Sequence, residues 1–534
     1  MLRVNQIKIR AGQDISALKT ALLKTLKIKS NELLDFRIIR KSIDARKKPD
    51  IYEVYMVDVE VLPPIENKLV KRMKNIVQRV EEQPYVLPGH GSEKMTLQPV
   101  IVGSGPAGLF CALLLSQVGY RPILVERGAP VEEREKDVEE FWRTGRLNPA
   151  SNVQFGEGGA GTFSDGKLNT LVKDSCGRNR YVLETFVKFG APEQILYEQK
   201  PHIGTDILSV IIRRMREEII RLGGTVRFHT QLTGLCFGDA NKLKGVIVNQ
   251  EERIDTNVCV LAVGHSARDT FQMLYGLGIP MQAKSFAVGV RIEHPQSMIQ
   301  VGQYGEQMAD AMPAAAYKLT EKLENGRGVY TFCMCPGGYV VNASSEENRL
   351  AVNGMSYSAR AGVNANSAVI VTVTPEDFGG THPLSGISFQ QMLEENAWKA
   401  GEGKIPVQCF GDFCRKMITE KFGEVMPQTK GGWKTADVRS IFPPEISDSL
   451  EQGILQMDRK IKGFARPDAV LSGVESRTSS PVRILRNEEM ECTFGGIYPC
   501  GEGAGYAGGI TSAAMDGMKA AEAIIKKYRY ELRP

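Results

Sequence analysis

Three glycines, Gly103, Gly105 and Gly108, have the spacing that lets a backbone turn approach a phosphate group. They lie in VIVGSGPAGLFCALLL, between a short apolar run, Val100–Val102, and an expected helix, Pro106–Val118. In this pattern the first glycine permits a tight turn, the second lets a pyrophosphate approach the backbone, and the third lets helix and strand pack closely. Free amides in the first helical turn would then face the phosphates.

An acidic residue completes the pattern. Glu126 ends a second expected strand, Pro122–Val125, and follows Gly103 by 23 positions, near the ~20-residue spacing of an acid that binds an adenosine ribose. Strand, glycines, helix, second strand and acid therefore predict a dinucleotide-binding βαβ unit. A second literal match, Gly156–Gly161, lacks such a unit around it.

The C-terminal segment favours FAD over NAD. Ile497–Gly505 is followed by Gly508–Ala513 and a helix to about Lys527. This order resembles the second FAD motif of flavoprotein oxidoreductases, in which a glycine loop brings a helix N-terminus beneath the isoalloxazine. Amides there stabilise the negative charge of reduced flavin. Val258–Gly264 resembles the intermediate strand of the same proteins, with Ala-Val-Gly where relatives have Ala-Thr-Gly.

Five segments carry a resemblance that extends along essentially the whole chain: Ser42–Tyr55, Val100–Gly128, Asn152–Thr170, Phe286–Gln296 and Cys500–Gly517. They are similar to the prokaryotic FAD-dependent dehydrogenase family also labelled NAD(FAD)-utilising dehydrogenases. The resemblance implies bound FAD and a glutathione-reductase-like Rossmann domain, and it implies no substrate. No second βαβ fingerprint for a separate NAD(P)H domain follows the first one, so NAD(P)H as a transient electron donor stays open.

The expected cofactor-binding residues come from these motifs. By analogy with the family, the Gly158–Ser164 loop would contact the flavin or pyrophosphate, and Leu232 would meet adenine through its backbone. The predicted set is Gly103, Ser104, Gly105, Pro106, Ala107, Gly108, Glu126, Arg127, Gly158, Gly159, Gly161, Thr162, Leu232, Ala262, Gly264, Gly501, Glu502, Gly503, Gly509, Ile510 and Thr511.

Side chains that could support metal binding or acid–base and thiol chemistry show no comparable pattern of spacing. The six histidines show no zinc spacing, and no metal is expected. His265, after the intermediate strand, and Arg291, as an anion clamp, are the catalytic candidates. Arg477 is a further candidate, with a solvated loop as the alternative. The spacing in Cys333-Met334-Cys335 departs from the redox pattern Cys-x-x-Cys, which favours packing.

Composition describes a globular chain with more than one core. Its 534 residues exceed the ~250–300 that one core accommodates. Hydrophobic residues make up 42% and charged residues 24%, ordinary globular values. Apolar runs such as Leu109–Leu115 are shorter than the ~18 residues of a membrane span. The first residues lack a signal-peptide core, and ten cysteines form no dense disulfide framework. We therefore expect a cytoplasmic protein without a membrane span.

The expected fold class is α/β, with a Rossmann domain interrupted by an inserted domain. Residues 1–92 form a small basic α+β domain with βαββα order and a linker, which includes an expected helix at Asn67–Val80. Residues 93–282 and 491–534 form the two parts of the FAD-binding domain. Residues 283–490 form the inserted α+β substrate or cap domain.

Positive charge is concentrated at the N-terminus. Met1–Leu97 contains 19 Lys and Arg against 12 Asp and Glu, and the other residues carry a net −2. This excess indicates an anionic partner, or, as the alternative, a solvated basic face.

The expected function is that of an FAD-dependent oxidoreductase, a dehydrogenase or reductase that moves hydride through flavin N5 to or from a small organic substrate. A flavin-dependent nucleic-acid-modifying enzyme and a noncatalytic FAD-binding sensor or assembly protein are the alternatives. The oligomeric state stays open.

Overall fold

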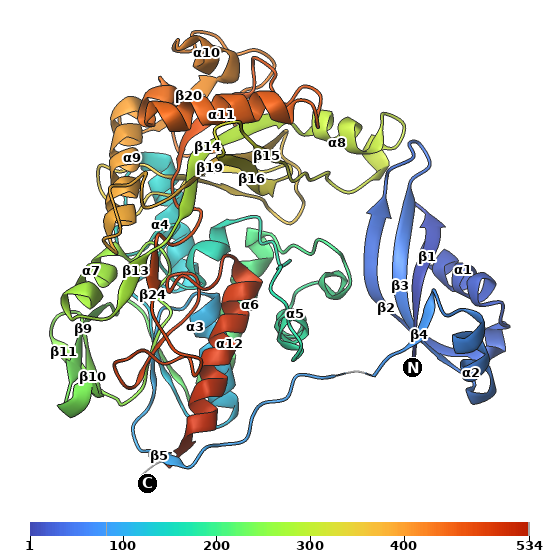
Figure 1. The fold of residues 1–534 in the computed structure, drawn as a ribbon, viewed down its shortest axis with the longest axis horizontal. Coiled ribbons are helices and arrows are strands. Elements are labelled where there is room, and N and C mark those ends of the chain that lie inside the picture. The colour runs from blue at the N-terminus through green and yellow to red at the C-terminus, as the bar shows by residue number, and fades with distance from the viewer. Residues whose placement is uncertain (82, 532–534) are drawn as a thin grey trace.

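A small N-terminal unit begins the chain. The computed structural model describes residues 1–81 and 83–531 (Figure 1). The first sheet has the order β2-β3-β1-β4, and two helices pack their leucines against its apolar side. The elements are β1 (Leu2–Arg10), α1 (Ser16–Leu26), β2 (Leu33–Asp44), β3 (Tyr52–Val61), α2 (Pro63–Arg72) and β4 (Val77–Arg79).

The last strand corrects the expected βαββα order to βαββαβ. The helix expected at Asn67–Val80 is confirmed as far as Arg72 and is wrong beyond it, because α2 ends at Arg72 and the chain then forms β4. β4 pairs antiparallel with β1, and Val77 opposite Val4 is buried in the core of this unit. Pairing with a distant strand thus overrides a locally helical pattern.

A parallel sheet with the order β25-β12-β6-β7-β8 forms the second unit. Its strands are β6 (Val100–Val102), β7 (Ile123–Val125), β8 (Thr225–Arg227), β12 (Cys259–Leu261) and β25 (Ile497–Pro499). The helices around it are α3 (Pro106–Gln117), α4 (Val131–Thr144), α5 (Arg178–Lys188), α6 (Thr205–Arg221), α7 (Arg268–Gly276) and α12 (Ile510–Lys527). A meander of β9 (Leu232–Phe237), β10 (Leu243–Val248) and β11 (Glu252–Asp255) is attached.

The two helices that follow the glycine motifs pack directly against each other. α3 and α12 lie side by side and share one buried cluster with α5 and α6 (Figure 1). Gly517 of α12 permits this close approach, since an added Cβ would lie 2.0 Å from the carbonyl oxygen of Ala107. Segments about 400 residues apart in sequence therefore form one core.

The third unit is a mixed sheet with the order β15-β16-β19-β14-β23-β20-β22. Its strands are β14 (Phe286–Pro295), β15 (Thr320–Lys322), β16 (Gly328–Cys335), β19 (Asn364–Val373), β20 (Ile405–Cys409), β22 (Trp433–Thr435) and β23 (Val470–Glu475). The helices of this region are α8 (Gln296–Tyr304), α9 (Ser385–Gly401), α10 (Phe410–Arg415) and α11 (Pro444–Met457). Smaller pairings add β17 (Tyr339–Asn342), β18 (Val352–Met355) and β21 (Thr429–Lys430), and pair β13 (Met281–Ala283) with β24 (Val482–Ile484).

An extended linker joins the first unit to the second (Figure 1). Tyr85 on this linker donates a hydrogen bond to Glu522 of α12. β5 (Glu93–Met95) then pairs with β26 (Tyr528–Tyr530), near the other end of the chain. The first unit also touches the rest of the molecule through Lys41, whose backbone exchanges hydrogen bonds with Tyr197 and Gln199.

Among the described residues, no helix combines the length and the apolar character needed to cross a lipid bilayer.

Candidate functional site

A cavity of about 350 Å³ lies at the carboxyl ends of the parallel strands. Val102, Val125, Ala262 and Cys500, at or just after the ends of β6, β7, β12 and β25, line it. In open parallel sheets this edge is where ligands bind. The mixed sheet supplies another wall, which includes Phe332 of β16. The cavity therefore lies between the two larger sheets.

Most of the predicted cofactor-binding residues meet at this cavity, although they come from five separate segments. Those that line it are Gly103, Gly105, Pro106, Ala107, Glu126, Arg127, Gly159, Gly161, Leu232, Ala262, Gly264, Gly501, Glu502, Gly509 and Ile510. Ser104, Gly108, Gly158, Thr162, Gly503 and Thr511 are not part of the lining.

The glycines of the first motif have different surroundings. A Cβ on Gly108 would lie 1.8 Å from the carbonyl oxygen of Gly103, and one on Gly103 would lie 2.3 Å from that of Ala262. A Cβ on Gly105 would meet only the Cα of Gly159, at 3.9 Å. Gly103 and Gly108 thus allow the backbone to pack, while Gly105 leaves space at the N-terminus of α3.

The second literal glycine match belongs to the same cavity. Residues 156–161 follow no βαβ course, and Gly159–Phe163 forms a single 3₁₀ turn. Gly158 donates its amide to the carbonyl of Ser104 at 2.9 Å, so this loop packs directly onto the first glycine loop. Arg134, fully buried, supports the loop by donating to the carbonyls of Glu157 and Gly159.

Glu126 organises the loops at one end of the cavity. Its carboxylate accepts hydrogen bonds from the amide and hydroxyl of Ser104, both at 2.8 Å. It also accepts from the amides of Gly128 and Gly156, each at 3.0 Å. The side chain lines the cavity but is only 5% exposed. One carboxylate therefore links both glycine loops to the end of β7.

A second helix N-terminus faces the cavity. α12 begins at Ile510 after Gly508 and Gly509, and all three residues line the wall. The first-turn amides of an α-helix have no acceptor within the helix and carry partial positive charge. Glu502, on the preceding loop, is a buried acid at the same wall. Burial raises the pKa of its carboxyl to about 7, and the Lys284 ammonium opposes this rise.

The two catalytic candidates occupy different positions. His265 lines the cavity, and its Nδ1 lies 2.8 Å from the Ser266 hydroxyl. Burial, together with the Arg477 and Arg268 cations, lowers the pKa of His265 to about 3, so its imidazole is neutral near pH 7. Arg291 is fully buried and is not part of the lining.

The Arg291 guanidinium is saturated by partners within the described chain. Its five N–H groups donate to four groups: Glu475 (2.7 and 3.2 Å), Cys333 carbonyl (2.8 Å), Asn366 (3.1 Å) and Asn353 (2.8 Å). The structure therefore gives no support to the anion clamp expected for Arg291. Instead, this side chain fixes three residues of the cavity wall, Cys333, Asn353 and Glu475.

Sequence reasoning missed most of the wall that faces the parallel sheet. The missed lining residues include Gln154, Lys167, Asn169, Phe332, Asn353, Glu475 and Thr478. The cysteine spacing favoured packing for Cys333, which instead lines the cavity. Arg477 does not lie on a solvated loop, because it is buried. Gln154, Lys167 and Asn169 lie inside the family-like segment Asn152–Thr170, which was the available signal. No local pattern marks Phe332, Asn353, Glu475 or Thr478.

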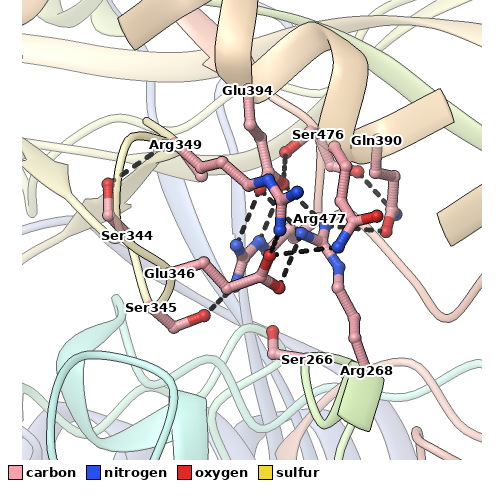
Figure 2. Close-up of polar contacts among 12 residues, drawn as sticks. Ser266, Arg268, Ser344, Ser345, Glu346, Arg349, Gln390, Glu394, Ser476 and Arg477 are labelled. Carbon is pink, nitrogen blue, oxygen red and sulfur yellow. Dashed lines mark hydrogen bonds and ion pairs between the residues drawn. The ribbon is translucent and has the colours of Figure 1, made fainter. Parts of the chain in front are cut away.

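Arg477 belongs to a buried charge cluster (Figure 2). Glu394 of α9 accepts two hydrogen bonds from Arg477, at 2.9 and 2.8 Å, and two from Arg268 of α7, both at 2.8 Å. Ser476 adds a fifth at 2.6 Å. The two cations hold the pKa of the Glu394 carboxyl well below its usual range despite complete burial. The cluster joins α7, α9 and the segment after β23.

A close relative covers the whole chain. A Clostridium beijerinckii protein named "Uncharacterized protein" is 47% identical to this chain over 542 residues, which cover 99% of this chain and 99% of the relative. The chain belongs to the same family as this clostridial protein. Residues 285–478 match the family described as "FAD-dependent protein, C-terminal domain-like". Residues 1–60 match a domain of unknown function, DUF8436.

Three solved structures match the chain distantly. Glycerol-3-phosphate dehydrogenase from Bacillus halodurans, complexed with FAD, has 10% identity over 80% of this chain and 64% of that chain, with a TM-score of 0.35. Glycine oxidase from Bacillus cereus has 11% identity over 80% and 95%, with a TM-score of 0.31. L-proline dehydrogenase from P. horikoshii has 12% identity over 81% and 94%, with a TM-score of 0.32. These scores are too low to assign an activity.

Proposed function

We propose that the protein is an FAD-dependent oxidoreductase that acts on a small organic substrate. The observation that carries this proposal is the convergence of two glycine loops and two helix N-termini, those of α3 and α12, on one cavity. A dinucleotide with two phosphates and an anionic ring system needs such donors at both ends. The match of residues 285–478 to an FAD-dependent family supports the same cofactor.

The glycine loops would bind the pyrophosphate. Gly105 leaves space beside the first amides of α3, so a phosphate can approach the backbone there. Glu126 would accept a hydrogen bond from the adenosine ribose, in exchange for one of the four that it accepts from the chain. Leu232 lines the same cavity, and its backbone would meet the adenine.

The α12 end of the cavity would hold the ring system. Bound FAD supplies hydride transfer at its N5 atom. The amides at the start of α12 would stabilise negative charge on the reduced ring, as helix N-termini do. Glu502, whose carboxyl has a pKa near 7, can hold or release a proton close to this position.

The mixed sheet would position the substrate. Phe332 offers an apolar ring that is 39% exposed, and Asn353 and Thr478 offer polar groups on the same wall. Neutral His265 can donate or accept a hydrogen bond there. NAD(P)H as the electron donor is part of this proposal and would enter transiently over the ring.

The test is an absorbance spectrum of the purified protein, followed by anaerobic titration with NADH and NADPH. We expect a flavin spectrum with about one FAD per chain, and bleaching of that spectrum by at least one of the two donors. Colourless protein that FAD does not reconstitute would contradict the cofactor. Bound flavin that neither donor nor dithionite reduces would favour a noncatalytic role.

A further inference from the structure

Cys333 and Cys335 are divided between the cavity and the core. β16 carries a bulge at this point: Phe332 pairs with Ala368 and Cys335 with Asn366, so three steps along β16 match two along β19. Cys333 has a positive φ of 43°, a conformation that non-glycine residues rarely adopt and that tends to persist at functional sites. It lines the cavity, while Cys335 is completely buried behind it.

Contacts from three residues hold the two cysteines in this arrangement. The Cys335 thiol donates a hydrogen bond to the Cys333 carbonyl oxygen at 3.2 Å. Arg291 donates to the same carbonyl at 2.8 Å, and its Nη1 lies 3.9 Å from the Cys335 sulfur. From the cavity side, Lys167 donates to the carbonyl of Met334. The two cysteines thus share one bulge beside the cavity that Glu502 and the start of α12 also line.

Charged groups from several elements surround the pair. They are Asp165 and Lys167 from the loop before α5, Arg291 from β14, Glu475 from β23 and Glu502 from the loop before α12. The Cys335 hydrogen bond, followed by the Lys167 and Arg291 cations, holds the pKa of Cys333 well below its usual range. Burial and the Cys333 sulfur raise the pKa of Cys335. The pair is therefore asymmetric: the surroundings favour the thiolate form at Cys333, which lines the cavity, and the protonated form at Cys335 behind it.

We propose that Cys333 and Cys335 are a redox-active dithiol that exchanges two electrons with the flavin. In the oxidative direction a Cys333–Cys335 sulfur–sulfur bond forms as the Cys335 S–H bond breaks. Bound flavin would accept the two electrons and the Cys335 proton, with Cys333 entering the step as its thiolate. Charge and atoms balance: thiolate, thiol and oxidised flavin become a disulfide and anionic reduced flavin. The proposal rests on FAD as the bound cofactor.

The experiment counts electrons and thiols in the flavin-loaded protein. Air-oxidised wild-type protein is titrated anaerobically with dithionite, and we expect it to take up about four electrons per flavin, while Cys335→Ser takes up about two. A long-wavelength thiolate–flavin absorbance band is expected midway in the wild-type titration. Cys176→Ser is the matched control, since Cys176 is exposed and does not line the cavity; it should behave as wild type.

The thiols are read independently by mass. Trypsin releases residues 328–349, a peptide whose two cysteines are Cys333 and Cys335. In the oxidised protein we expect this peptide to lack two hydrogens and to resist alkylation, and after reduction to take up two alkyl groups. This measurement needs no substitution, so a variant that misfolds leaves the proposal testable.

The outcomes separate the two proposals. Protein without bound flavin would overturn the cofactor and, with it, the dithiol. Flavin-loaded wild-type protein that takes up only two electrons, with peptide 328–349 alkylated equally in both states, would overturn the dithiol alone.

Discussion

The side chain of Glu126 illustrates how one residue determines the shape of a cavity. Four donors from three segments, the two glycine loops and the end of β7, converge on its carboxylate, which ties these segments together. Such a carboxylate would serve the cofactor twice, through the ribose and through the loop geometry.

Glu126→Ala should weaken FAD binding by roughly 1–3 kcal/mol, because it leaves buried amides of Ser104 and Gly156 without acceptors. It should also lower the melting temperature of the flavin-free protein. Flavin fluorescence titration and thermal melting measure the two effects. Glu133→Ala is the control, since that side chain is 56% exposed and pairs with His229. Unchanged affinity in the Glu126 variant would rule out both roles.

Two glycine substitutions should separate binding from folding. Gly105→Val places a branched side chain in open space at the cavity, so the protein should fold but purify without flavin. Gly108→Ala forces a methyl group against the carbonyl of Gly103 and should strongly destabilise the fold. Flavin content after gel filtration and melting curves test this pair. Full flavin occupancy in Gly105→Val would contradict the phosphate site.

At this scale the sequence predicts what local spacing controls. The sequence predicts Gly103, Gly105 and Glu126 because the tight turn, the approach of the pyrophosphate and the acid for the ribose all fall within one βαβ unit. Cys333, Glu475 and Thr478 were missed as wall residues because their place at the cavity depends on the packing of two sheets, which no local pattern encodes. The same holds for Arg291, whose saturation depends on partners up to 184 positions away.

Among the elements, α7 and α9 are joined by charge rather than by apolar packing alone. Glu394→Gln should destabilise the protein by roughly 3–5 kcal/mol, because it removes the charge that compensates two buried arginines. Glu395→Gln on the same helix is the control, since Glu395 is 42% exposed and pairs with Arg349; it should cost less than about 1 kcal/mol. Urea unfolding measures both. Equal losses of stability in the two variants would contradict a structural role for the charge cluster around Glu394.

Strand β14 carries a titrating group in its buried centre. Burial raises the pKa of Glu293 to about 7, and among the described residues its Oε1 has no hydrogen-bond partner. A raised carboxyl pKa means that the folded state binds the proton more tightly than the unfolded chain, so stability falls as pH rises from about 4.5 to 7. Glu293→Gln should therefore melt higher than wild type at pH 8 and close to it at pH 5. If the two melting temperatures differ by the same amount at pH 5 and at pH 8, the raised pKa of Glu293 is contradicted.

Elements were predictable where periodicity and tertiary packing agree. Pro106–Val118 was expected as a helix, and α3 occupies that place. β4 was not predicted, because Val77 continues the helical spacing of α2 and forms a strand only by pairing with β1. β16 continues to Cys335 through the bulge, which depends on its register with β19.

The whole molecule holds its N-terminal unit by a limited interface. Ala11 and Ile51 pack against Ile299, Tyr304 and Met312 of the α8 region, and the unit's main core is a separate cluster. The chain thus places a basic unit beside the larger body without merging the two cores.

Protein that starts at Glu93 should fold and keep its flavin, because the cavity takes no residue from the removed part. It should melt at a lower temperature, since the apolar patch on α8 becomes exposed. If the N-terminal unit recruits an anionic partner, retention on a polyanion column should be lost as well. Flavin content, melting and elution across a salt series test these points. Flavin-free or insoluble protein would show that the unit completes the fold of the body, and unchanged retention would exclude recruitment.

The position of α12 in the sequence determines when the core around α3 can be completed during synthesis. This helix completes the core around α3 and contributes one end of the proposed flavin site, yet Ile510–Lys527 is made about 400 residues after α3. At ~5–20 residues per second, α3 waits tens of seconds between its emergence from the ribosome and the arrival of its partner helix. During that interval the side of α3 that packs against α12 is uncovered. The end of the proposed flavin site that α12 supplies is therefore absent until this helix has been made.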